Sequence, residues 1–111
     1  MNHSTRIRFM RLVLFFDLPM ETPAQRKSYS RFRKLIISEG FIMLQKSVYS
    51  KLAINDQDSA HVIKRIKRNK PAGGLVQILK VTEKQFANME YITGEYSRNA
   101  ILDDLSEIVI L

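Results

Sequence analysis

An apolar run that ends in an acid and a proline constrains the fold of this 111-residue chain more than any other feature. Leu12 to Phe16 are five consecutive apolar residues, followed by Asp17 and, two positions later, by Pro19. A run this short and this apolar indicates a buried strand in the middle of a sheet. Proline cannot continue a hydrogen-bonded ladder, so the strand ends before it. We therefore expect the carboxylate of Asp17 at the carboxyl-terminal end of a central strand.

The charge of the chain is unevenly distributed. Residues 1–70 contain 15 Lys+Arg against 5 Asp+Glu, a balance of +10, and residues 71–111 contain 3 against 6, a balance of −3. The basic part indicates a polyanion such as DNA or RNA as its partner, and the acidic part a protein contact, with solubility alone as the simpler alternative. The chain has no cysteine, which excludes thiol chemistry and cysteine–zinc sites and fits a cytoplasmic protein. No apolar run reaches the roughly 20 residues of a membrane helix.

A first helix is predicted after the strand at 11–17. Thr22 and Gln25 have the spacing of a capping box, Pro23 suits the first helical position, and Gly40 ends the helix. At about 100° per residue, the apolar side chains fall on one arc that faces a sheet. We expect the opposite arc to expose five cations that contact nucleic-acid phosphates, namely Arg26, Lys27, Arg31, Arg33 and Lys34.

The rest of the chain alternates strands and helices. Residues 41–53 indicate one long bent strand or two short strands that meet near residues 45–47. A second helix follows from the caps near Asn55 to about Asn69, and strands are predicted at 75–81 and 89–93 with a short helical turn at 82–88 between them. A last short strand is expected at 107–111. The second helix is predicted to present further phosphate-binding cations, namely Lys64, Arg65, Lys67 and Arg68.

This order predicts an α+β fold, a ferredoxin-like βαββαβ sandwich with an additional C-terminal strand. Residues 1–9 are expected to form a flexible leader, 10–93 the domain, and 94–111 a C-terminal extension. Two helices on one sheet face leave the other face bare, and the first strand is apolar on both faces. A bare apolar face needs a cover, which sheet-to-sheet homodimerisation would supply. The last strand would then pack on the dimer partner or, alternatively, on its own chain.

Asp17 is the candidate catalytic and metal-binding residue. An Asp before Leu-Pro is also an ordinary turn residue, and His3 and His61 read as surface histidines. A hard cation such as Mg²⁺ needs several oxygen ligands, and no second acid is predicted beside Asp17. A two-fold dimer that brings together two copies of Asp17 would share one ion across its axis. Such an ion would support metal-dependent cleavage of a phosphodiester.

Five stretches of the chain resemble a known family. They are RLVLFFDLP (11–19), RFRKLIISEGF (31–41), MLQKSVY (43–49), IKRNKPAGGLVQILKVTEKQF (66–86) and EIVIL (107–111). Together, over about residues 10–111, they resemble the small CRISPR-associated subunit of spacer acquisition, the family usually called Cas two, and most of all its type II variants.

The resemblance implies a ferredoxin-like homodimer that bridges two pairs of a separate CRISPR integrase and holds a short DNA duplex. It also implies a metal-dependent nuclease acting on RNA or DNA, whose metal-binding aspartate falls on Asp17. Arg26, Arg31 and Arg33 match the basic positions of the family loosely. A ferredoxin-fold module unrelated to immunity is the remaining alternative.

Overall fold

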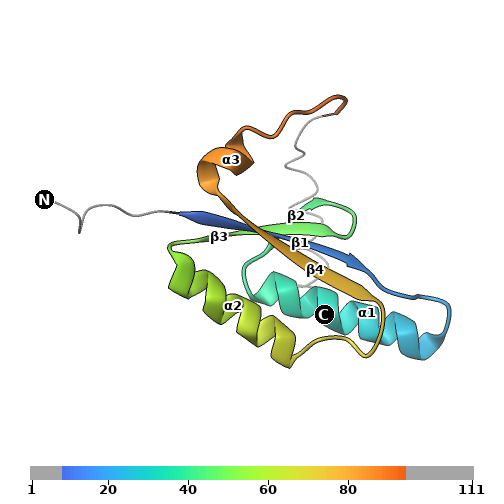
Figure 1. Cartoon of the computed structure of the whole chain (residues 1–111). Helices are drawn as coiled ribbons and strands as arrows, with labels where there is room; N and C mark the ends of the chain where they lie inside the picture. The colour runs from blue at the N-terminus through green and yellow to red at the C-terminus, as the bar shows by residue number, and fades with distance from the viewer. Residues whose placement is uncertain (1–8, 95–111) are drawn as a thin grey trace, which may run out of the picture.

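A computed structural model describes residues 9–94 of the chain, and Figure 1 shows their arrangement. The elements follow in the order β1 (Met10–Asp17), α1 (Pro23–Ser38), β2 (Ile42–Gln45), β3 (Val48–Ala53), α2 (Asp56–Arg68), β4 (Leu75–Thr82) and α3 (Glu83–Ala87). The strands form an antiparallel sheet in the order β2-β3-β1-β4. The predicted ferredoxin-like α+β fold is confirmed. The expected leader, apart from its last residue, and the extension with its final strand lie outside the described residues.

The apolar run is a central strand, as the sequence predicts. β1 lies between β3 and β4, with Leu14 opposite Tyr49 on one side and Ile78 on the other. Leu12 and Leu14 are fully buried on the face that α1 and α2 cover. The ring of Phe16 meets that of Phe32 edge to face, with centroids 5.4 Å apart, and such aromatic pairs add to the stability that burial provides.

Both long helices begin at the caps that the sequence indicates. The Thr22 hydroxyl accepts a hydrogen bond from the Gln25 backbone N–H at 3.1 Å, and the Gln25 side chain accepts one from the Thr22 N–H at 3.0 Å. At α2, the side chain of Asn55 accepts from the Asp58 N–H at 2.7 Å. Figure 1 shows α1 and α2 side by side on one face of the sheet, with α3 on the other.

Residues 41–53 form two strands, so the second of the two alternatives is confirmed. The turn between β2 and β3 places Ser47 at φ 66°, in the left-handed region that non-glycine residues rarely adopt. The Ser47 carbonyl accepts a hydrogen bond from the Phe16 N–H at 3.1 Å. That bond ties the hairpin turn to the end of β1, close to Asp17.

Two expectations are wrong. Residues 89–93 form no strand, because no strand among the described residues pairs with them. Arg33 and Lys34 are both predicted to face solvent, but both are partly buried. Ile37, the residue four positions after Arg33 along α1, is buried. Residues four positions apart in a helix differ by only about 40° around the helix axis, at about 100° per residue. Arg33 therefore lies near Tyr29 on the inward side.

Candidate functional site

Asp17 is the last residue of β1 and is exposed. In the sheet register it lies opposite Leu75, at the end of β1 where the chain turns toward α1. Alternation along the strand puts its side chain on the same face as Val13 and Phe15, away from the two long helices. No group of three His, Cys, Asp or Glu side chains that could hold a metal occurs within residues 9–94. Within residues 9–94 Asp17 is thus not part of a cluster of three such side chains, and a divalent cation at Asp17 would need further oxygen ligands.

The backbone at Asp17 is held by the loop that joins α2 to β4. Gly74 in this loop has φ +87°, and a Cβ added to it would lie 2.7 Å from the Asp17 carbonyl oxygen and 2.6 Å from Leu18 Cδ2. Only glycine combines this conformation with so close an approach. Leu18 itself is buried, which anchors the residue that follows Asp17. The position of Asp17 is thus fixed by a segment 57 residues away in the sequence.

The sheet face that carries Asp17 is apolar and largely exposed. Val13 on this face is buried, but five large apolar side chains are between 37% and 56% exposed, namely Phe15, Ile42, Leu52, Leu75 and Leu79. The sheet register places all five on the face opposite α1 and α2. The bare apolar face predicted from the first strand is therefore present, and Asp17 lies on it.

The cations of α1 differ in what they contact. Lys27 and Arg31 are exposed, and Lys34 is partly buried. Arg26 donates from Nη1 to the Glu21 carbonyl at 2.9 Å and to the Met20 carbonyl at 3.2 Å, so it steadies the loop after β1. Arg33 donates from Nε to the Tyr49 hydroxyl at 3.1 Å and links α1 to β3. Lys27 and Arg31 are the α1 cations best placed to meet a ligand.

The cations of α2 lie on its outer face, as predicted. Lys64, Lys67 and Arg68 are exposed. Arg65 forms a two-nitrogen contact with Glu39, from Nη2 to Oε1 at 2.8 Å and from Nε to both carboxylate oxygens at 3.0 Å. This hydrogen bonding raises the pKa of the Arg65 guanidinium above its ordinary value. Arg65 thereby joins α2 to the C-terminal end of α1.

Sequence reasoning missed the binding potential of Lys70 and the role of Arg11. In the sequence Lys70 only marks the end of α2, yet it is exposed and lines two hollows on the helix side of the molecule. Its place directly after a basic helix was the available signal.

Arg11 donates from Nε to Glu83 Oε1 at 2.8 Å, and its guanidinium carbon lies 4.5 Å from the centroid of the Phe86 ring. Arg11 therefore holds α3 on the open face of the sheet.

A family model described as CRISPR associated protein Cas2 matches residues 10–89, which include every strand and helix of the described structure. The chain belongs to the Cas2 family. The "CRISPR-associated endoribonuclease Cas2" of Treponema denticola is 52% identical over 102 residues, covering 92% of this chain and 100% of that relative. The protein of the same name from Streptococcus mutans is 48% identical, covering 92% of this chain and 93% of the relative.

A solved structure described as "Crystal structure of cas2" has the same fold. It matches with a TM-score of 0.57 at 18% identity, covering 81% of this Cas2-family chain and 92% of the solved one. At that identity the likeness concerns the fold alone. Within the part of the chain that the structure describes, no helix is long and apolar enough to cross a bilayer.

Proposed function

We propose that this Cas2-family protein is the homodimeric subunit of a CRISPR adaptation complex, which binds duplex DNA and bridges the spacer integrase. The observation that carries the proposal is the division of the domain into two opposite surfaces. The open face of the sheet is apolar, whereas the outer faces of α1 and α2 are basic. Figure 1 shows α1 and α2 together on one side of the sheet, so the open face lies on the other side.

The apolar surface favours a second copy of the chain as its partner. Five exposed large apolar side chains on one flat sheet face are costly in water, and a two-fold dimer covers such a face on both chains at once. Covering the sheet leaves the helices of both copies outward. The dimer would then present two basic surfaces, which suits an elongated polyanion such as a DNA duplex better than a small anion.

The basic surface favours contact with phosphates and not with base edges. The exposed cations lie on outer helix faces, which position a duplex through its backbone without reading its sequence. An adaptation subunit has to hold DNA of any sequence, and this form of binding meets that need. The acidic C-terminal part of the chain is left for the integrase.

A second candidate function is cleavage of RNA or DNA with Mg²⁺, as the relatives' name "endoribonuclease" suggests. The exposed carboxylate of Asp17 on the apolar face favours it, because the same dimer would bring two copies of Asp17 toward one axis. Those two carboxylates fit the oxygen ligands that Mg²⁺ prefers. The ion would polarise the scissile phosphate or activate water. Asp17 would hold it, and the Gly74 contact would fix where Asp17 stands.

The two functions separate in one experiment. The purified protein and its Asp17→Ala variant are combined with the cognate integrase, and spacer integration and nuclease activity are measured on the same preparations. We expect integration to persist in Asp17→Ala, because Asp17 lies on the face opposite the basic helices. Loss of integration by a folded, dimeric Asp17→Ala would contradict the scaffold proposal and favour the enzyme. Cleavage that survives the substitution would point to a contaminating nuclease.

A further inference from the structure

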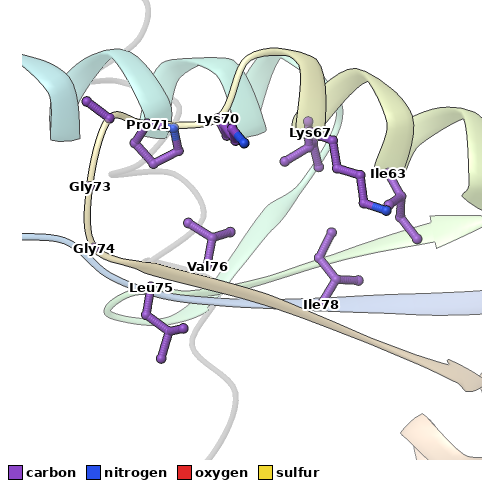
Figure 2. A pocket seen from close by; sticks show the side chains of 11 residues that line it. Ile63, Lys67, Lys70, Pro71, Gly73, Gly74, Leu75, Val76 and Ile78 are labelled. Atoms are coloured by element: carbon purple, nitrogen blue, oxygen red, sulfur yellow. The ribbon is translucent and has the colours of Figure 1, made fainter.

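Three hollows on the helix side of the domain share their lining residues. The first lies on the outer face of α1 and is lined by Lys27, Ser30, Arg31 and Lys34. The second, of 490 Å³, lies between α1 and the segment 69–72, and both Arg31 and Lys70 line it. The third, of 630 Å³, lies between α2 and β4, and Lys70 and Lys67 line it (Figure 2). Arg31 therefore borders the first two hollows, and Lys70 borders the last two.

These five cations line three hollows that are linked by shared lining residues. We use "cation track" for Lys27, Arg31, Lys34, Lys67 and Lys70, which lead from α1 over the α2–β4 loop to α2. In Figure 2 the loop carries Lys70 past α1, and the side chain of Lys67 extends toward Ile63. Leu75 points to the opposite side of β4, toward the open face. The track is thus confined to the helix side and is separate from the apolar surface.

No carboxylate side chain is among the residues that line the three hollows. Some cations elsewhere in the described part of the chain are paired with acids, as in Arg11–Glu83, Arg65–Glu39 and Lys80–Asp56. Five positive charges around hollows that no described carboxylate lines repel one another and attract an anion. The pattern therefore favours the track as a place where a polyanion binds.

The residues that line the second hollow are of the kinds that bind phosphate. Arg31 and Lys70 supply two cations from different elements, and Ser28 supplies a hydroxyl. Its remaining lining is mostly apolar, from Phe32 and Leu35 on α1 and from Pro71 and Ala72 on the loop. Apolar walls lower the local dielectric constant, so a charge contact made between them is stronger than one on a flat, hydrated helix face.

We propose that Arg31 and Lys70 together bind one backbone phosphate of the nucleic acid, at the point where its strand crosses from α1 to α2. This inference rests on the proposed function, because it assumes that a nucleic acid is the ligand of the basic surface. It adds a site to that function and assigns Lys70 to binding. Lys27 and Lys34 then contact the strand before the crossing, and Lys67 after it.

The test measures duplex binding by the full-length protein over a series of salt concentrations, with a labelled short DNA duplex and fluorescence anisotropy. Lys70→Gln is compared with Lys84→Gln, because Lys84 is also exposed but lies on α3, across the sheet from the track. We expect Lys70→Gln to flatten the plot of log K against log salt by about 0.9 for each phosphate that the variant no longer neutralises. Lys84→Gln is expected to leave the slope unchanged, and Lys70→Arg to retain it.

A double-mutant cycle tests whether Arg31 and Lys70 share one phosphate. If they do, Arg31→Gln and Lys70→Gln together weaken binding by less than the product of their separate fold-losses. Two results would overturn the shared phosphate site while leaving duplex binding itself intact. One is an equal slope of log K against log salt for Lys70→Gln and Lys84→Gln, and the other is strictly multiplicative losses of affinity in the cycle. Absence of duplex binding by the wild type would overturn both the proposed function and the phosphate site. A third result would assign the track to an acidic protein surface instead. In that case Lys70→Gln binds the duplex as the wild type does, but loses the binding to polyglutamate that the wild type has.

Discussion

At the scale of single residues, two adjacent glycines in the α2–β4 loop offer a matched comparison. Gly74 has φ +87° and approaches Asp17 and Leu18 closely, whereas Gly73 has nothing within 4 Å of an added Cβ. We expect Gly74→Ala to lower the free energy of unfolding by roughly 1–3 kcal/mol, from strain at positive φ together with the collision. Gly73→Ala is expected to change it by less than about 1 kcal/mol. Urea denaturation of both variants measures the difference, and equal values would show that the loop does not brace Asp17.

The residues that the sequence could not assign are those whose role depends on a loop. Asp17 was predictable because a local pattern, an apolar run before a proline, fixes its place at a strand end. Lys70 and Gly74 were not, because nothing local says which strand or helix a loop packs against. Arg33 was misplaced for a different reason, since it lies four residues after Tyr29 at the border of the inward arc of α1, where the helical pattern alone does not separate inward from outward side chains.

At the scale of elements, α3 depends on one ion pair with β1. Arg11 hydrogen-bonds to Glu83 with two nitrogens and lies over the Phe86 ring, and the Glu83 N–H donates to the Phe9 carbonyl at 3.3 Å. The hydrogen bond from Arg11 lowers the pKa of Glu83 below its ordinary value of 4.5. Because this pKa is lowered on folding, the pair stabilises the protein above about pH 4.5 and the contribution is lost as the pH falls through the folded-state value.

The corresponding prediction concerns Glu83→Gln. At neutral pH we expect this variant to be less stable than the wild type, by no more than about 1 kcal/mol because the Glu83 side chain is 39% exposed. The difference should shrink as the pH is lowered below 4.5, where the wild-type carboxylate also becomes protonated. Urea denaturation between pH 7 and pH 3 measures it, with Glu90→Gln as the control for an exposed acid near α3. A difference that does not depend on pH would mean that charge plays no part in holding α3.

The elements themselves were largely predictable from the sequence. The spacing of apolar residues identified β1 and β4, and the same spacing together with the helix caps identified α1 and α2. In each of these elements the local sequence pattern and the tertiary packing agree. The strand expected at 89–93 fails because alternating side chains are not sufficient for a strand, which also needs a neighbouring strand to bond. The sequence could not decide between one bent strand and a hairpin at 41–53. The hairpin depends on the turn at Ser47, and no sequence pattern predicts the positive φ of that residue.

At the scale of the whole molecule, the proposed dimer can be tested by placing a charge on the apolar face. Leu79 on β4 and Ile54 in the bend before α2 are similarly exposed, at 53% and 56%, but Leu79 lies on the open face of the sheet while Ile54 lies outside the sheet. We expect Leu79→Glu to produce monomers, because burying an unpaired carboxylate in an apolar interface costs several kcal/mol. Ile54→Glu should remain dimeric. Analytical ultracentrifugation gives the oligomeric state of each variant.

The monomeric variant would also separate the two surfaces of the molecule. Leu79→Glu leaves α1, α2 and the cation track unchanged, so each monomer should still bind a duplex with the salt dependence of a single track. It should nevertheless fail in spacer integration, because a bridge between two integrase pairs requires both copies. If Leu79→Glu stays dimeric and integrates spacers normally, the open face is not the dimer interface, and the division into an apolar and a basic surface needs another explanation.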